Sequence, residues 1–360
     1  MKITIIVNPN AGKRSVQKQL ELIAGRLLLS GIARRVDIVH TQARGHATAA
    51  AAALQAAECD LIIACGGDGT INEVLNGLMQ SGSRIPVAIL AAGTSNDFAT
   101  ALRLPDTAAP FCEMVRAGRY EQVDIGCANG RYFMNAAAFG MFTEVAHGTN
   151  QKQKNNLGKL AYYLQAVREA PEQLAFSMPL SISSREYTAE GNYSVCLIVN
   201  SMSVASMRRL MRRADVTDGL FDVLLMKKRP PLNNAEQIVH VIQQSGERFF
   251  GLAPESKEEP AAEEPPALPA APRLHELLKP LGADFDPTFV YFQTAHVTFS
   301  SPEGDNVVTD VDGERFGHLP LTIDVVPQAI RLLVPPEEPA GPAVPAIVRR
   351  QRTGSGTKRQ

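Results

Sequence analysis

The sequence predicts an α/β N-terminal domain with a parallel sheet, followed by a mainly antiparallel β-sandwich as a second domain. Residues 1–105 alternate short apolar runs with helical stretches, as in parallel sheets that carry helices on their faces. From about Val123 onward, short apolar runs recur between turn signals, a spacing typical of antiparallel strands. The length of 360 residues suits two domains.

Continuous apolar runs predict the strands of the first domain, because a strand buried on both faces needs no polar alternation. They are Ile3–Val7, Val36–Val39, Leu61–Ala64 and Val87–Leu90. Apolar spacing and stop signals predict the intervening helices. These are Ser15–Leu29, His46–Ala57, Ile71–Met79 with a stop at Gly82, and a further helix that ends before Pro105.

The second domain is expected to contain short strands with two helical interruptions, at about 157–169 and 234–249. The predicted strands are Arg131–Ala137, Leu180–Ile182, Ser194–Val199, Phe221–Met226, Val290–Phe292, His296–Phe299 and Val307–Val311. We place the first domain at 1–125 and the second at 126–334, with 320–334 packing back on the first. Residues 253–287 hold eight of the 24 prolines and are expected to form a flexible insert, and 335–360 a disordered basic tail.

Charge and cysteine content exclude several classes of protein. Thirty-six Lys and Arg balance 37 Asp and Glu, so we expect no nucleic-acid partner. The five cysteines are odd in number and form no Cys-x-x-Cys pair, which favours a reducing, cytoplasmic location. The N-terminal apolar run is too short for a signal peptide, and no run reaches the length of a membrane span.

Two glycine-rich turns follow neighbouring predicted strands and predict a phosphate site. The first comprises Gly66, Gly67, Asp68, Gly69 and Thr70, and the second is the run 93–99, with Gly93, Thr94, Asn96 and Asp97. Glycine there lets backbone N–H groups approach a phosphate closely. Asp68 adds a carboxylate suited to Mg²⁺. The first loop, with Asn8, Pro9, Asn10, Ala11 and Gly12, also follows a strand, and carboxyl ends of parallel strands lie side by side.

Two common nucleotide motifs are absent. Gly12-Lys13 is followed by Arg14 and lacks the upstream glycine of a P-loop, and Asn72 stands where the last glycine of a dinucleotide fingerprint belongs.

Taken together, these three loops resemble the diacylglycerol kinase catalytic domain, most closely the bacterial lipid kinases related to sphingosine and ceramide kinases. The likeness covers most of residues 1–335 outside the proline-rich insert. It implies the NAD kinase/diacylglycerol kinase-like fold, with ATP in a cleft between the two domains. It also implies that a lipid hydroxyl attacks the γ-phosphate, and it places Thr41 near the nucleotide. His46 is expected to cap or pack, and Asp124 to serve as a structural residue at the domain junction.

The resemblance also suggests a Mg²⁺ site in residues 215–222. Asp218 would be the side-chain ligand, with Asp215 and Leu220 flanking it, and Thr217 stands where an Asp is common in the family. The alternative is that Asp218-Gly219 only forms a hairpin turn.

A second carboxylate motif, Asp312-Gly313-Glu314, resembles the family's Asp-Gly-Glu signature and makes Glu314 the general base for the lipid hydroxyl. A carboxylate can orient a hydroxyl and accept its proton, and phosphoryl transfer otherwise depends on positioning and charge neutralisation. Asp312-Gly313 is also expected to form a type I′ turn.

Taken together, we expect an ATP- and Mg²⁺-dependent kinase of a diacylglycerol-like lipid, peripherally bound at the inner face of the membrane. Two basic runs, Lys152/Lys154/Lys159 and Arg208/Arg209/Arg212/Arg213, and the basic tail could face an anionic bilayer or be solvated surface. A homodimer is compatible with the sequence. The alternatives are a kinase of the same superfamily acting on NAD or a sugar phosphate, and a nucleotide-binding regulatory protein without transfer chemistry.

Overall fold

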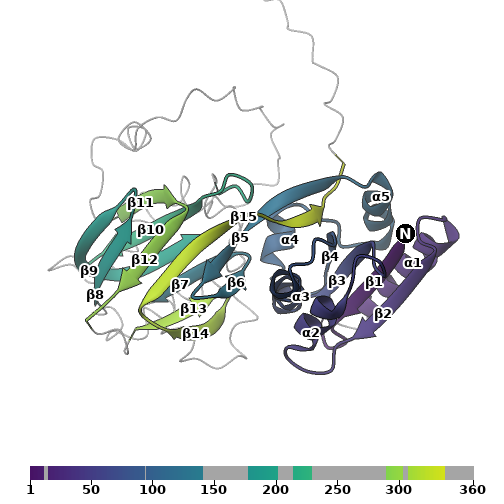
Figure 1. Ribbon diagram of the computed structural model, residues 1–360, viewed down its shortest axis with the longest axis horizontal. Coiled ribbons are helices and arrows are strands. Elements are labelled where there is room, and N and C mark those ends of the chain that lie inside the picture. Colours follow the sequence, from purple (N-terminus) through teal and green to yellow (C-terminus); the bar gives the residue numbers. More distant parts are fainter. Residues whose placement is uncertain are drawn as a thin grey trace, which may run out of the picture.

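The computed structural model describes residues 1–11, 15–93, 95–140, 177–201, 214–228, 289–302 and 307–336. These residues form two lobes (Figure 1): one carries helices, and the other consists of strands in the described residues. The predicted helices at 157–169 and 234–249, the insert, both basic runs and the tail from 337 onward lie outside the described residues.

The N-terminal lobe contains four parallel strands in the order β4-β3-β1-β2. The strands are β1 (Lys2–Val7), β2 (Arg35–His40), β3 (Leu61–Gly66) and β4 (Val87–Ala91). The helices are α1 (Ser15–Leu29), α2 (His46–Ala53), α3 (Asp68–Ser81), α4 (Asp97–Ala101) and α5 (Ala108–Ala117). The parallel α/β class expected for this part of the chain is therefore correct.

Alternation along β1 and β3 sends side chains to two separate cores, because successive residues of a strand point to opposite faces. Ile3 and Ile5 belong to the core lined by α1 and α5, whereas Ile6 belongs to the core lined by α2 and α3. All three isoleucines are completely buried. The continuous apolar runs of the sequence thus reflect a sheet covered on both faces.

The C-terminal lobe consists mainly of antiparallel strands around one aromatic core that includes Phe139, Phe221 and Phe299. Its strands are β5 (Tyr120–Ala128), β6 (Arg131–Phe133), β7 (Ala136–Gly140), β8 (Met178–Ser184), β9 (Thr188–Val199), β10 (Phe221–Lys227), β11 (Phe289–Thr294), β12 (His296–Ser300), β13 (Val308–Val311), β14 (Glu314–His318) and β15 (Leu321–Leu333). The phenyl rings of Phe139 and Phe299 pack edge to face with centroids 5.1 Å apart, a favourable aromatic geometry.

The long strand β15 connects the two lobes. It pairs antiparallel with β12 and β5, and its residue Leu332 pairs in parallel with Val87 of β4. All strands of the described residues therefore belong to one continuous sheet, which crosses from lobe to lobe along β15 (Figure 1).

Several predicted boundaries differ from the structure. The helix expected from Ile71 begins at Asp68, and the helix expected to reach Ala57 ends at Ala53. The single strand expected at Arg131–Ala137 is divided into β6, which pairs with β5, and β7, which pairs with β9 and β13. The chain changes partners at residues 134–135, whose N–H groups bond to the carboxylate of Asp312 instead of a strand. Helix α5 is not anticipated from the sequence.

Candidate active site

The loops that follow β1, β3 and β4 meet at the carboxyl edge of the parallel sheet. The Asn8 side-chain amide donates to the Thr70 hydroxyl at 3.2 Å, which joins the first loop to helix α3. Gly67 and Gly93 touch through their backbones, since a Cβ added to Gly93 would lie 2.5 Å from the Cα of Gly67. The structure therefore brings the three loops together, and glycine is required for their close contact.

The loop after β3 leads directly into α3. Gly67 precedes the helix in extended conformation, and the backbone N–H of Thr70 donates to its carbonyl at 2.9 Å. A Cβ on Gly66 would lie 2.6 Å from the Cβ of Thr70. Asp68 and Gly69 form the first turn of α3, where the N-terminal end of a helix favours anions. All five predicted residues of this loop thus lie at one helix start.

In the loop after β4, Asn96 adopts the left-handed conformation, with φ 51°. Its side chain accepts a hydrogen bond from the N–H of Gly93 at 2.8 Å and donates to the Gly93 carbonyl at 3.1 Å. Asn96 thus shapes the loop. Asp97 is 7% exposed at the start of α4. The predicted nucleotide residue Thr94 lies outside the described residues.

The loop after β1 is an Asx turn. The side-chain oxygen of Asn8 accepts from the N–H of Asn10 at 3.0 Å, and its carbonyl accepts from Ala11 at 3.1 Å. Pro9 lies within the turn, and Gly12 is outside the described residues.

Thr41 follows β2 at the same edge, and its N–H donates to the carbonyl of Val7 at 2.8 Å. The carboxylate of Glu73 on α3 accepts from the N–H groups of Gly45 at 2.8 Å and Ala47 at 3.1 Å, so a side chain of α3 caps the start of α2. The His46 ring accepts from the N–H of Gln42 at 3.0 Å. This bond gives His46 a structural role in the loop before α2.

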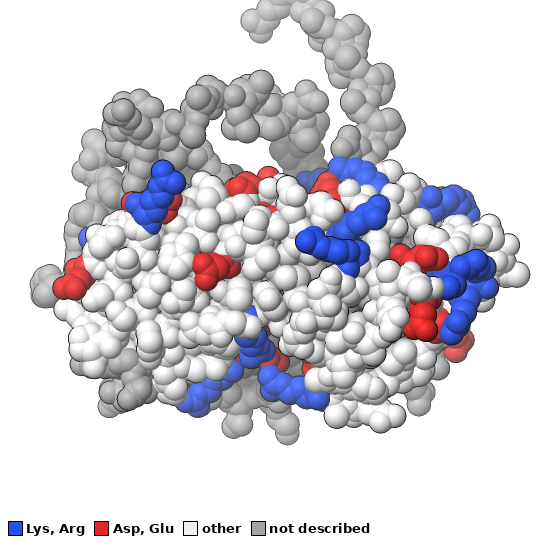
Figure 2. Space-filling model, in the orientation of Figure 1, with Lys and Arg blue, Asp and Glu red and all other residues white. Residues whose placement is uncertain are grey.

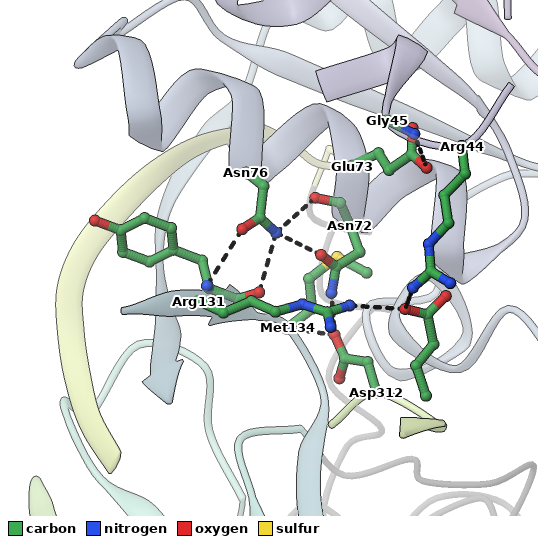
Figure 3. Close-up of polar contacts among 10 residues, drawn as sticks. Arg44, Gly45, Asn72, Glu73, Asn76, Arg131, Met134 and Asp312 are labelled. Atoms are coloured by element: carbon green, nitrogen blue, oxygen red, sulfur yellow. Dashed lines mark hydrogen bonds and ion pairs between the residues drawn. The ribbon is translucent and has the colours of Figure 1, made fainter. Parts of the chain in front are cut away.

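Glu314 faces this edge from the other lobe. Its Oε2 atom accepts from Arg44 of the loop after β2 at 2.5 Å and from Arg131 of β6 at 2.7 Å. Figure 3 shows both guanidinium groups turned toward one carboxylate. The Glu314 side chain is 40% exposed, so the carboxylate is accessible at the junction of the lobes.

The Asp312 carboxylate forms a contact between the lobes that the sequence does not predict. Asp312 and Gly313 have φ of 51° and 79°, as a type I′ turn requires. Beyond that, the Asp312 carboxylate accepts four N–H groups at 2.5–3.0 Å, and Figure 3 shows Asn72 and Met134 beside it. The donors are the Asn72 side chain and the backbones of Met134, Asn135 and Ala136. Burial raises the pKa of this carboxyl, and the four hydrogen bonds oppose that effect.

A signal for this contact is present in α3. Asn72 and Asn76 lie one turn apart on an otherwise apolar face of α3, and both side chains are buried. Asn76 donates to the Asn72 carbonyl at 2.9 Å and the Tyr132 carbonyl at 3.0 Å, and it accepts from the Tyr132 N–H at 3.2 Å. Buried amides at helical spacing indicate a polar partner, although they do not name it.

The predicted Mg²⁺ stretch lies between Ala214 and β10. The Asp215 carboxylate accepts from the N–H and hydroxyl of Thr217 at 3.0 and 2.7 Å. Asp218 accepts from the N–H of Leu220 at 2.9 Å. The pKa of Asp218 is raised, chiefly by burial and further by the charges of Asp215 and Asp124. Concentrated oxygen donors of this kind fit a hard cation such as Mg²⁺.

In the described ranges, no group of three or more His, Cys, Asp or Glu side chains is placed to hold an ion. Asp124 is 1% exposed, and it accepts from the N–H groups of Gly219 and Gln328, each at 2.7 Å. It ties this stretch to β15, so it has the structural role expected for it.

Comparison with known proteins matches residues 2–128 to the diacylglycerol kinase catalytic domain family. The diacylglycerol kinase of Bacillus subtilis (strain 168) is 34% identical over 225 residues, which cover 62% of this chain and 73% of that protein. That of Staphylococcus saprophyticus is 32% identical over 238 residues, covering 66% and 75%. A crystal structure of a diacylglycerol kinase from Bacillus anthracis str. Sterne shares the fold, with TM-score 0.65, 21% identity and coverage of 93% and 97%.

The fold, the glycine-rich loops and these matches define a kinase. The chain belongs to the diacylglycerol kinase family. Membership implies that ATP is the phosphate donor. Among the described residues, no helix is long and apolar enough to cross a membrane.

Proposed function

We propose that the protein is an ATP- and Mg²⁺-dependent kinase that phosphorylates the free hydroxyl of a diacylglycerol-like lipid. The observation that carries this proposal is the ion pair of Glu314 with Arg44, which belongs to the loop after β2 at the same edge of the sheet as the glycine-rich loops. The relatives named diacylglycerol kinase support the choice of a lipid acceptor.

In this reaction the lipid hydroxyl oxygen forms a bond to the γ-phosphorus of ATP. The bond from that phosphorus to the oxygen bridging the β- and γ-phosphates breaks, its electron pair leaves with ADP, and the hydroxyl proton passes to Glu314. The backbone N–H groups at the start of α3 orient the phosphates, and Thr70 donates its hydroxyl. Positioning and charge neutralisation account for most catalysis of phosphoryl transfer.

Asp68 and Asp97 would hold the Mg²⁺ that accompanies ATP, because both carboxylates lie at the edge where the loops meet. Asp218, Asp215 and the carbonyl of Leu220 would hold a further Mg²⁺ beside the second lobe. Mg²⁺ supplies positive charge that offsets the charge of phosphates and clustered carboxylates. A lipid acceptor places the protein at the inner surface of the membrane.

The test is transfer of labelled γ-phosphate from ATP·Mg²⁺ to diacylglycerol, phosphatidylglycerol, ceramide and sphingoid bases in mixed micelles, with NAD and sugar phosphates as soluble acceptors. Glu314→Gln should lower turnover at least a hundredfold, since general-base catalysis contributes about 10²–10⁴. Glu121→Gln is the matched control, because Glu121 is also paired with an arginine, at 2.6 Å, but lies at the start of β5.

A labelled lipid that disappears with Glu314→Gln supports the acceptor class and the base together. Labelling of NAD or a sugar phosphate alone would replace the lipid by a soluble acceptor. ATP binding without any labelled product would favour a regulatory role. Near-normal turnover of Glu314→Gln would remove Glu314 as the base.

A further inference from the structure

Two arginines from different lobes meet at a single carboxylate oxygen. Arg44 and Arg131 approach Oε2 of Glu314 at 2.5 and 2.7 Å, and their side chains are 76% and 33% exposed. Exposed ion pairs contribute about 0–1 kcal/mol to stability. The three charged groups at the junction of the lobes therefore contribute little to the stability of the fold.

Two guanidinium groups contact this one carboxylate oxygen. Each guanidinium has five N–H donors, and the contacts with Glu314 use one nitrogen of each. The remaining N–H donors of the two guanidinium groups suit an anion. A guanidinium matches the geometry of phosphate as well as that of carboxylate. Figure 2 shows basic side chains, with acidic ones among them, at the lower edge of the molecule.

The backbone beside Arg44 is held in place relative to the phosphate loops. Thr41 is bonded to the end of β1, and Gly45 is bonded to Glu73, which lies on α3 five residues after Asp68. Gly45 itself has φ 82°, a conformation that favours glycine. The loop that carries Arg44 is therefore attached to the same helix whose start forms the predicted phosphate site.

Arg131 is attached to α3 by a separate route. The neighbouring residue Tyr132 exchanges two hydrogen bonds with Asn76 of α3, at 3.0 and 3.2 Å. The guanidinium of Arg131 lies 5.8 Å from the ring centre of Phe316, within cation–π range. The loop that carries Arg44 and the side chain of Arg131 are thus held by contacts other than the bonds to Glu314.

We propose that Arg44 and Arg131 form a clamp for a phosphoryl group, and that the Glu314 carboxylate occupies the clamp until that group arrives. On its arrival the arginines exchange the carboxylate oxygen for a phosphoryl oxygen, and Glu314 is released to face the lipid hydroxyl. This inference rests on the proposed function. The phosphoryl group can come from the end of ATP or from the phosphorylated lipid.

The test compares binding of ATP·Mg²⁺ and ADP·Mg²⁺ by calorimetry, without turnover. If the clamp holds the terminal phosphate, Arg44→Gln and Arg131→Gln should each weaken ATP binding about tenfold and change ADP binding less than twofold. Arg44→Lys keeps the charge and should recover part of the loss. Arg35→Gln is the matched control, since Arg35 is an exposed, ion-paired arginine at the opposite end of β2.

A second measurement identifies the other source of the phosphoryl group. Sedimentation with phosphatidylcholine vesicles, with and without phosphatidate, should show a tenfold weaker preference for phosphatidate in Arg44→Gln if the clamp holds the lipid product. Circular dichroism should be unchanged, because the Arg44 side chain is mostly exposed.

Either selective loss supports the clamp and names its source. Variants at positions 44 and 131 that bind both ATP and phosphatidate vesicles as the wild type does would overturn it. An equal loss for ATP and ADP, with no loss for phosphatidate, would also overturn it. Wild-type protein that binds neither ligand would contradict the proposed function, whereas failure of the clamp alone leaves the effect of Glu314→Gln intact.

Discussion

Two carboxylates at the junction of the lobes, those of Asp312 and Glu314, each bind several groups from different parts of the chain. One carboxylate, that of Asp312, accepts four N–H groups drawn from α3 and from the link between β6 and β7. Glu314, two residues later, binds arginines from both lobes. The turn that carries Glu314 is therefore held to α3, and the start of α3 belongs to the candidate phosphate site. Asp312 positions the proposed base and does not itself need to transfer protons.

Removal of the Asp218 carboxylate should weaken the apparent affinity of the enzyme for Mg²⁺. Asp218→Asn keeps the shape of the side chain but removes one of the negative charges that lie near one another at Asp218, Asp215 and Asp124. We expect at least a tenfold rise in the Mg²⁺ concentration that gives half-maximal kinase activity. Titration of activity with Mg²⁺ measures this, and Asp37→Asn, an exposed ion-paired aspartate, is the control. An unchanged Mg²⁺ requirement would mean that residues 215–222 form only a turn and bind no Mg²⁺.

The Cys127 thiol should react faster with alkylating reagents than the other four cysteines. Burial raises the pKa of Cys65 to about 12 and that of Cys196 well above its usual range. A raised pKa leaves little thiolate at pH 8, and the thiolate is the reactive form. Cys127 is the one cysteine that is not fully buried, although burial raises its pKa too. Alkylation at pH 8 followed by peptide mapping should label Cys127 first, and Cys127→Ser should remove the fast phase.

Helices α2 and α3 act as one unit beneath the loops. They contact each other through Gly77, where an added Cβ would lie 2.3 Å from the carbonyl oxygen of Thr48. Glu73 of the same helix caps α2. Close packing and capping together fix the position of α2 and of the preceding loop, and therefore the position of the Arg44 backbone.

Two helix-interior glycines should respond in opposite ways to alanine. At Gly25 in α1 an added Cβ meets nothing within 4 Å, so Gly25→Ala should stabilise the protein by about 1 kcal/mol through helix propensity. At Gly77 the same change forces α2 away and should cost about 1–3 kcal/mol, as overpacking does. Urea unfolding of both variants measures the difference. Equal changes in the free energy of unfolding would show that α2 shifts to accommodate the added methyl group at no cost.

At the scale of the whole molecule, β15 makes the two lobes one structure. Leu321 lies in the aromatic core, Leu332 in the core beneath α2 and α3, and Leu333 in the core beneath α1 and α5. One strand therefore contributes to every core of the described residues. This connection holds the proposed nucleotide site on one lobe and the proposed base on the other in a common geometry.

Unfolding should accordingly be cooperative across the lobes. Leu332 is completely buried, and Leu332→Ala should cost about 2–5 kcal/mol. The loss should appear in both lobes, as faster amide hydrogen exchange in β3 and in β12 alike, because β15 lies between them. Faster exchange confined to β3 would mean that the lobes unfold independently.

Local patterns in the sequence account for the alternation of strands and helices, the glycine-rich turns and the type I′ turn at Asp312. Apolar period and turn chemistry depend on residues only a few positions apart, so these features are legible in the chain. The contacts of Arg44 with Glu314 and of Asn72 with Asp312 span 270 and 240 positions. Such pairs leave no local pattern, because they form only when the sheet brings distant turns to one edge. The glycine loops were therefore predictable, whereas the charged and amide groups that join them to Glu314 depended on the packing of the two lobes.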